Sequence, residues 1–201
     1  NLKTKGLGAI RNDGFICGIA VATGKDTAYF PLRHSDTDID PSRIDKIWEV
    51  LNKKIFQNEN ITKIFHNAMY DVCWIRAVTG MKMKGRIVDT MIAASVIDEN
   101  RFKYSLDSLS KDYLNEEKYK YDLQKKTLEW SGGTVKDPMT NMHKLPASIV
   151  KEYAKQDVNL TYKLWNIFNK EIDKVLYTKE DGEQKTCRQI FELETKLFLC
   201  L

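Results

Sequence analysis

Residues 61–80 read ITKIFHNAMYDVCWIRAVTG, and this stretch decides the fold. Its first five residues are mostly apolar or β-branched, which predicts a short buried strand. Asn67 follows at a position where its side chain can cap a helix over residues 68–78, and Gly80 can end that helix. The stretch therefore predicts a strand that runs directly into a helix.

The same passage from strand to helix recurs downstream. Residues 86–89 predict a second strand and residues 90–97 a second helix. Upstream, the apolar runs 15–23 and 27–32 flank a Gly-Lys-Asp turn and predict a hairpin, while Asp40-Pro41 opens an amphipathic helix. This alternation predicts the α/β class, with a mixed sheet flanked by helices. Open sheets of this kind bind ligands at the carboxyl ends of their strands.

The C-terminal half is less regular. Residues 118–144 contain Trp-Ser-Gly-Gly, Asp-Pro and several lysines, and we expect a long irregular excursion there. A long helix is predicted from Pro146 to about residue 174, and residues 179–182 interrupt the chain after it. A last amphipathic segment then carries Ile190, Leu193, Leu197 and Leu201 in helical register.

The composition indicates an ordinary globular protein. Of 201 residues, 42% are hydrophobic and 30% charged, which excludes a disordered chain. The net charge of +4 is compatible with a polyanionic partner but too small to demonstrate one. The four cysteines lie far apart with no CxxC pair, so neither a disulfide scaffold nor a zinc knuckle is indicated. We expect a soluble protein of the reducing cytoplasm with no membrane partner, because neither an apolar span nor a leader is present.

Asp157 is the first residue that points to chemistry. On the predicted long helix it shares an apolar face with Tyr153, Leu160 and Leu164. A buried polar group without a partner costs about 1–3 kcal/mol, so this aspartate needs an ion pair, hydrogen bonds or a metal ion. A structural ion pair is one interpretation, and a metal site is the other.

Asp71 is the second such residue. It lies in the first turn of the helix that follows residues 61–65, where a favourable interaction with the helix dipole is explanation enough by itself. However, both acids fall where a strand-helix sheet presents its ligands. Two convergent carboxylates are what a hard divalent cation requires. We therefore hypothesise that Asp71 and Asp157 meet in space.

Four segments, in order and spacing, resemble motifs of the 3′-to-5′ proofreading exonuclease domain of family A DNA polymerases. The segments are HNAMYD at 66–71, VDTMIA at 88–93, YSLDSL at 104–109 and YAKQD at 153–157. The end of the chain, residues 188–201, is similar to the helix by which such proteins enter the polymerase portion. The resemblance implies an exonuclease domain over residues 1–178, with a linker and the start of that helix at 179–201.

The resemblance also implies an RNase H-like fold and a mechanism. In that family four carboxylates hold two Mg²⁺ or Mn²⁺ ions, and water attacks the 3′-terminal phosphodiester of DNA. By analogy Asp71 and Asp157 are metal ligands, and the hydroxyl of Tyr153 orients the attacking water. The histidine subtype would need His at position 152, which is Glu. A half-buried core aromatic is the alternative for Tyr153.

The first motif departs from the family. The expected Asp-x-Glu-Thr is replaced by Asn1-Leu2-Lys3-Thr4, so both acids are missing. Asn1 retains one oxygen without charge, and Lys3 has no lone pair for a metal. Unit charges about 4 Å apart interact by about 4 kcal/mol at an effective dielectric near 20. We hypothesise that Lys3 is an internal counter-ion to Asp71 and Asp157, that tight paired-metal binding is lost, and that hydrolysis is largely inactivated.

The resemblance further implies a groove for a short single strand of DNA. Its lining would be Thr4, Leu7, His66, Asn67 and Tyr70, with Leu7 as a wedge against the terminal bases. Leu7 as plain core and Asn67 as only a helix cap remain alternatives. A run of basic residues could follow a DNA strand or form a solvated loop. The run consists of Lys118, Lys120, Lys125 and Lys126, with Tyr119 and Tyr121 interleaved.

Two other functions stay open. An RNase D-like exoribonuclease would use the same carboxylates and tyrosine, and a non-catalytic DNA-binding or scaffolding module is favoured by Asn1 and Lys3. The expected partners are a single-stranded 3′ end or primer-template DNA and a polymerase domain of the same parent chain. We expect that chain to continue upstream of Asn1 and to act in the cytoplasm, which is the host cytoplasm if the source is a phage.

Overall fold

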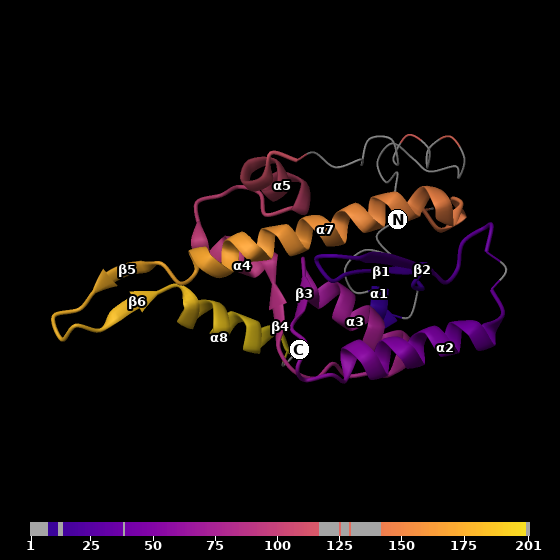
Figure 1. Cartoon of the computed structure of the whole chain (residues 1–201), viewed down its shortest axis with the longest axis horizontal. Coiled ribbons are helices and arrows are strands. Elements are labelled where there is room, and N and C mark those ends of the chain that lie inside the picture. Colours follow the sequence, from indigo (N-terminus) through magenta and orange to yellow (C-terminus); the bar gives the residue numbers. More distant parts are fainter. Residues whose placement is uncertain are drawn as a thin grey trace.

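A computed structural model describes residues 8–11, 14–37, 39–116, 125, 129 and 142–199 of the chain. Within this part the strands form three two-stranded pairs and the helices surround them (Figure 1). The strands are β1 (Gly18–Ala22), β2 (Thr27–Pro31), β3 (Lys63–Phe65), β4 (Ile87–Asp89), β5 (Val175–Thr178) and β6 (Gln184–Thr186). The longer helices are α2 (Pro41–Leu51), α3 (Ala68–Thr79), α4 (Thr90–Ile97), α5 (Leu106–Leu114), α7 (Ala147–Glu171) and α8 (Arg188–Leu199). Short helical turns are α1 (Gly8–Arg11), η2 (Asn52–Phe56) and η3 (Met142–Lys144). The predicted α/β class is confirmed.

The predicted N-terminal hairpin is confirmed as the antiparallel pair β1–β2. Gly24 turns the chain between the two strands at φ +86°, a conformation that L side chains rarely adopt. A Cβ atom at this position would lie 2.5 Å from Cζ of Tyr162. The turn therefore packs directly against α7, and only glycine fits there without displacing the tyrosine.

Helices cover both faces of the strands. The long helix α7 crosses β1, β2 and β3 on one side, whereas α2 and α3 lie on the other (Figure 1). The core on the α2 side forms because apolar side chains of β2, α2 and α3 interlock. Its buried members are Leu32, Trp48, Leu51, Phe56 and Ile75. The start of α2 is the predicted one, since Asp40 caps it and accepts a hydrogen bond from the backbone N–H of Ser42 at 3.1 Å.

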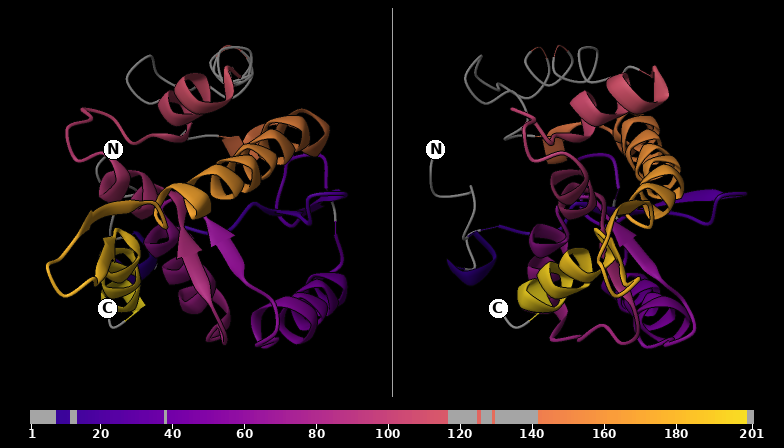
Figure 2. Two further views of the ribbon diagram at one scale, coloured as in Figure 1. Left: turned by 60° about the vertical axis from the view of Figure 1, so that its left-hand side comes forward. Right: turned by 90° about the vertical axis from the view of Figure 1, so that its left-hand side faces the viewer.

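The largest core lies along the C-terminal half of α7. Helices α4, α5 and α8 surround this part of α7, as both views of Figure 2 show. The apolar stripe predicted on α7 is confirmed, because Leu160, Leu164 and Phe168 are all buried. Phe191 of α8 stacks on Trp165 with ring centroids 5.6 Å apart and joins α8 to the core.

The parallel pair β3–β4 confirms the repeated passage from strand to helix. Phe65 and Asp89 are neighbours in its register, and each is the last residue of its strand. Helix α3 follows β3 after two residues, and α4 follows β4 at once. The starts of both helices therefore lie side by side at one edge of the pair.

The C-terminal end differs in two ways from the prediction, which was an interruption followed by an amphipathic helix. Residues 179–182 fall in the connection of a hairpin, β5–β6, which extends away from the helices in Figure 1. The apolar residues Ile190, Leu193 and Leu197 of α8 are all more than half exposed. Leu201 and most of residues 118–144 lie outside the described part of the chain. In that part, no helix is long and apolar enough to cross a membrane.

A matched pair of leucines tests this assignment of the core. Leu164 is fully buried and Leu193 is 57% exposed. We expect Leu164→Ala to lower the free energy of unfolding by about 2–5 kcal/mol, and Leu193→Ala to change it by less than about 0.5 kcal/mol. Urea unfolding followed by circular dichroism measures both, and equal effects would contradict the placement of α7 and α8.

Candidate active site

The candidate site lies at the carboxyl ends of β3 and β4. The residues that follow these strands are His66-Asn67, which lead into α3, and Thr90, which opens α4. Because the strands are parallel and adjacent, both segments reach the same edge. This is where a sheet of this type presents ligands.

The carboxylate of Asp89 connects the two segments. It is 2% exposed and accepts backbone N–H bonds from Asn67 at 3.0 Å, Ala68 at 2.7 Å and Met91 at 2.8 Å. These donors belong to the N-terminal ends of α3 and α4, where backbone N–H groups have no partner within the helix. One buried carboxylate therefore caps two helices and fixes their relative position.

The prediction that Asn67 caps α3 through its side chain is wrong. Asn67 occupies the N-cap position, but its side chain makes no capping hydrogen bond. Its backbone is left-handed, with φ 64° and ψ 55°, a conformation that asparagine tolerates better than most residues. In this conformation the N–H groups of Asn67 and Ala68 both reach Asp89, so the cap comes from the neighbouring strand.

Thr90 also connects the end of β3 to the start of α4. Its hydroxyl donates to the carbonyl oxygen of Phe65 at 3.1 Å. Because that single proton is committed, the 2.9 Å contact between Nδ1 of His66 and Oγ1 of Thr90 requires His66 to donate. The proton on Nδ1 sets the tautomer of a neutral His66 and holds its ring beside the start of α3.

Asp71 lies in the first turn of α3. Its side chain is accessible to solvent, yet protein surrounds it on the other sides. This loss of solvent, followed by the negative charges of Asp89 and Asp157, raises the pKa of Asp71 to about 7. The charge of Asp157 acts on Asp71 although the two residues are 86 positions apart in the sequence (157 − 71). An acid on α7 thus acts electrostatically on an acid on α3.

Tyr153 and Asp157 lie on the half-buried face of α7. The ring of Tyr153 packs against the cluster formed by Leu145 and Val150, as the core interpretation expects. The residue also stands one helical turn before Asp157, so it lies on the same side of α7 as the acid. Packing of the ring and a role for the hydroxyl are compatible.

The predicted groove residues that the structure describes lie together. His66 is half-buried, and Asn67 and Tyr70 are exposed around the start of α3. Tyr70 makes an edge contact with Trp74, with centroids 6.5 Å apart, and partial burial raises the pKa of its hydroxyl. Lys125 is an exposed helical residue. The other predicted contacts lie outside the described residues; they are Asn1, Lys3, Thr4, Leu7, Lys118, Tyr119, Lys120, Tyr121 and Lys126.

Comparison with known proteins decides the family. Residues 3–173 match the model of the 3′-to-5′ exonuclease of A-type DNA polymerases. The chain belongs to this exonuclease family. The resemblance seen in the sequence motifs is thereby confirmed, and so is the class of enzyme.

The relatives of this exonuclease domain are much longer polymerases. It is 33% identical over 187 residues to the DNA polymerase DpoZ of Acinetobacter phage SH-Ab 15497, covering 92% of this chain and 26% of that protein. It is 25% identical over 177 residues to the DNA polymerase of Escherichia phage T5, covering 81% and 19% respectively. The chain therefore spans about a quarter or less of these two relatives.

Solved structures support the fold. Brucella melitensis NrnC with bound Mg²⁺ superimposes with a TM-score of 0.61 at 17% identity, covering 97% of this chain and 77% of that one. A nuclease in its apo form gives a TM-score of 0.64 at 15% identity, covering 96% and 77%. At such identity the likeness establishes fold alone, and it confirms the expected RNase H-like architecture.

The described acids of the exonuclease site have the donor chemistry that a divalent cation requires. Asp71 and Asp157 offer carboxylates whose charges repel each other, and oxygen ligands of this kind favour Mg²⁺ or Mn²⁺. Asp89 is already engaged by three backbone donors. Within the described part of the chain, no three His, Cys, Asp or Glu side chains are arranged to hold a metal.

Sequence reasoning missed the role of Asp89. It treated residues 88–93 only as part of a motif, although an aspartate at the last position of a strand, directly before a helix, is a standard N-cap signal. That signal predicts the bond to the N–H of Met91. The bonds to Asn67 and Ala68 depend on the pairing of β3 with β4.

The Asp89 cap is tested by Asp89→Ala, with Asp98→Ala as the matched control. Within the part of the chain that the structure describes, the carboxylate of Asp98 accepts one hydrogen bond, from the exposed N–H of Asn100. Because Asp89→Ala leaves three donors without an acceptor, we expect a loss of about 3–5 kcal/mol in unfolding free energy, against less than about 1 kcal/mol for Asp98→Ala. Hydrogen exchange should also accelerate at the amides of Asn67 and Ala68. Unchanged exchange there would contradict the cap.

The raised pKa of Asp71 predicts a stability effect with a defined sign. A folded pKa of about 7 exceeds the ordinary value of about 3.9, so folding becomes less favourable as the pH rises between these values. We expect Asp71→Asn to raise the melting temperature by a few degrees at pH 8 in chelating buffer. The gain should shrink as the pH falls towards 4.

The control for this experiment is Asp45→Asn, which changes an exposed acid on α2. Thermal melts across the pH range measure both variants. If Asp71→Asn lowers the melting temperature at pH 8, or changes it equally at all pH values, Asp71 does not carry an unfavourable charge in the fold.

Proposed function

We propose that this exonuclease domain binds the 3′ end of single-stranded DNA as the proofreading module of a larger family A polymerase, in a form whose hydrolysis is weakened. The observation that supports the proposal is that the charge of Asp157, on α7, contributes to the raised pKa of Asp71, on α3. Family membership supports the class of reaction. The replacement of the first-motif acids by Asn1 and Lys3 supports the weakened hydrolysis.

We assign a separate role to each residue of the site. Asp71 and Asp157 would hold one divalent cation, Mg²⁺ or Mn²⁺, which when bound neutralises charge at the scissile phosphate. Tyr153 positions water through its hydroxyl, while Tyr70, His66 and Asn67 line the path of the strand. A raised pKa at Asp71 favours this role, since a cation relieves the same repulsion that a proton does.

The first motif explains why two tightly bound ions are not expected. An amide at Asn1 is a weak ligand, and an ammonium at Lys3 adds positive charge beside the acids. Lys3 then acts as an internal counter-ion to Asp71 and Asp157. Thr4 and Leu7, next in the sequence, contact the terminal nucleotide.

The polymerase portion of the parent chain is the proposed protein partner. Ile190, Leu193 and Leu197 form an exposed apolar stripe on α8, which is the last helix that the structure describes. The relatives, of which this chain covers 26% and 19%, are polymerases, and such a stripe suits packing against another domain. On this proposal residues 1–178 are the exonuclease domain, residues 179–201 lead towards the polymerase, and the protein acts in the cytoplasm, that of the host if it comes from a phage.

Two rival functions have specific support. The fold likeness to NrnC, which one structure shows bound to pGG, favours an RNase D-like exoribonuclease. The substitutions Asn1 and Lys3 favour a non-catalytic module that binds or braces DNA. Both rivals make different predictions for a chain whose first motif is restored.

The test is the double variant Asn1→Asp/Lys3→Glu, incubated with 3′-labelled DNA or RNA strands and Mn²⁺. We expect the unaltered chain to bind DNA with little release, and the restored chain to release mononucleotide from DNA at least about 100-fold faster, because the second pair of carboxylates returns. The control adds Asp157→Asn to the restored chain and should abolish the gain.

Each rival has its own outcome. Rapid release by the unaltered chain would contradict weakened hydrolysis. A restored chain that digests RNA in preference to DNA would establish the exoribonuclease. A restored chain that binds DNA but releases nothing would establish the non-catalytic module.

A further inference from the structure

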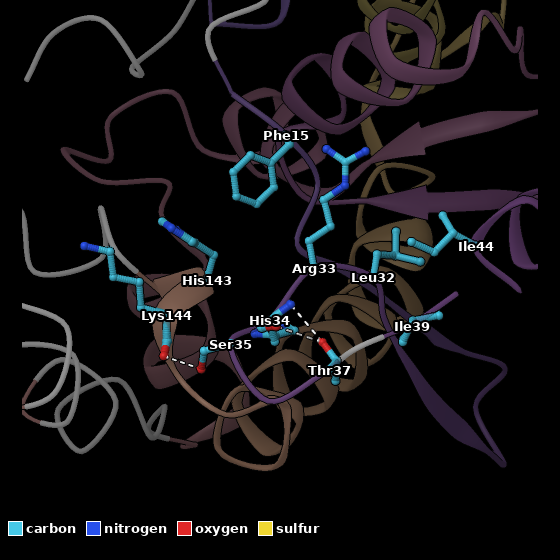
Figure 3. Close-up of a pocket in the computed structure, with 10 residues that line it drawn as sticks. All are labelled: Phe15, Leu32, Arg33, His34, Ser35, Thr37, Ile39, Ile44, His143 and Lys144. Carbon is cyan, nitrogen blue, oxygen red and sulfur yellow. Dashed lines mark hydrogen bonds between the residues drawn. The ribbon is translucent and has the colours of Figure 1, made fainter. Parts of the chain in front are cut away.

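A concave surface lies near the start of α7. It is a hollow of about 390 Å³ that opens to solvent, and side chains from three separate segments surround it (Figure 3). We call it the basic groove. Its walls are formed by Phe15, which precedes β1, by residues 32–35 with Thr37, Ile39 and Ile44, and by the pair His143-Lys144 from η3.

The charges of the basic groove have one sign. Arg33 and Lys144 are exposed at its rim, His143 stands beside them, and no residue that lines the groove is acidic. No ion pair joins Arg33 or Lys144 to an acid within the part of the chain that the structure describes. Asp36 brings a carboxylate near His34, but its Oδ1 accepts the N–H of Ala147 at 2.8 Å.

An aromatic platform lies next to these charges. The guanidinium of Arg33 lies over the ring of Phe15, 5.6 Å from its centroid. The ring of His143 meets Phe15 edge-on at 5.1 Å. Burial, followed by the positive charge of Lys144, lowers the pKa of His143.

The basic groove is held in shape by hydrogen bonds across it. Nδ1 of His34 donates to the carbonyl of Leu145 at 3.1 Å, since a carbonyl can only accept. Nε2 of His34 must then accept from the hydroxyl of Tyr29, at 2.5 Å. Ser35 donates to the carbonyl of Lys144 at 2.6 Å. These bonds fix the turn after β2 against η3, so the groove needs little rearrangement to receive a ligand.

The basic groove adjoins the candidate active site. Leu145 separates Lys144 from α7, and the ring of Tyr153 packs on the cluster that contains Leu145. Tyr153 lies six residues into α7, or about 9 Å along the helix from its start at 1.5 Å per residue. A strand that leaves the acids along α7 reaches the groove within a few nucleotides.

We propose that the basic groove binds the single strand upstream of its 3′ end, with Arg33 and Lys144 on phosphates and the Phe15–His143 pair against a base. Cationic side chains interleaved with aromatic rings are what sequence-tolerant binding of single strands requires. The planar guanidinium of Arg33 suits a phosphate better than an ammonium does. This subsite rests on the proposed function and extends it beyond the terminal nucleotide.

The test compares DNA strands of two lengths. The full chain is titrated with fluorescent oligothymidylates of 2 and about 12 nucleotides, and anisotropy is measured at several salt concentrations. For Arg33→Gln/Lys144→Gln we expect binding of the longer strand to weaken about 10-fold or more. The slope of log K against log salt should fall by about 1.4, because each phosphate that a cation no longer neutralises lowers it by about 0.7. Binding of the dinucleotide should not change.

Two controls accompany the double variant. Lys170→Gln removes an exposed charge near the far end of α7 and should leave both affinities unchanged. Arg33→Lys keeps the charge but loses the planar guanidinium. It should therefore weaken binding of the longer strand, while the slope of log K against log salt stays the same. All substituted residues are exposed, and equal melting temperatures confirm that the variants are folded.

The outcomes separate this subsite from the function on which it rests. An unchanged affinity of the double variant for the longer strand would overturn the subsite and leave the proposed function intact. Equal weakening by Lys170→Gln would also overturn it, since the effect would then be one of net charge. If the unaltered chain binds neither strand, the proposed function fails and the subsite fails with it.

Discussion

The three hydrogen bonds to the carboxylate of Asp89 determine where the chemistry of this protein can occur. They tie the end of β4 to the starts of both α3 and α4, and they hold Asn67 in a left-handed conformation. Thr90 adds a second tie to the same link through the carbonyl of Phe65. Because α3 begins at this point, these hydrogen bonds determine the direction of the helix and therefore the position of Asp71. The orientation of the acid is thus set by a neighbouring strand and not by the helix alone.

Repulsion between acids near the start of α3 has an electrostatic cost. Asp89 is compensated by backbone donors, whereas loss of solvent and the negative charges of Asp89 and Asp157 all act on Asp71. Such clustering of like charges is typical of functional sites, since a packed core without a task would avoid it. A cation, a proton or the ammonium of a lysine can each relieve the repulsion. On our proposal, the ammonium of Lys3 is one of the groups that relieve it.

The sequence predicts much of the fold because the deciding signals are local. Strand-to-helix passages, the cap at Asp40 and the apolar stripe of α7 all depend on residues close together in the chain. The predictions that failed, or that could not be made, depend on distant contacts. Asn67 carries a strong local cap signal, yet Asp89 supplies the cap from a strand more than twenty residues away. Likewise, periodicity finds the apolar residues of α8 but does not show that Leu193 faces outwards.

The central claim is that Asp71 and Asp157 share one site, and their electrostatic coupling measures it most directly. Carbon-detected NMR of selectively labelled aspartate carboxyls can follow the titration of Asp71 in metal-free buffer, in the unaltered chain and in Asp157→Asn. The account predicts a pKa of about 7 for Asp71 in the unaltered chain and a lower value in the variant, because a negative neighbour has been removed. An ordinary pKa near 4 in both chains would contradict it, since the two acids would then be too far apart to act together.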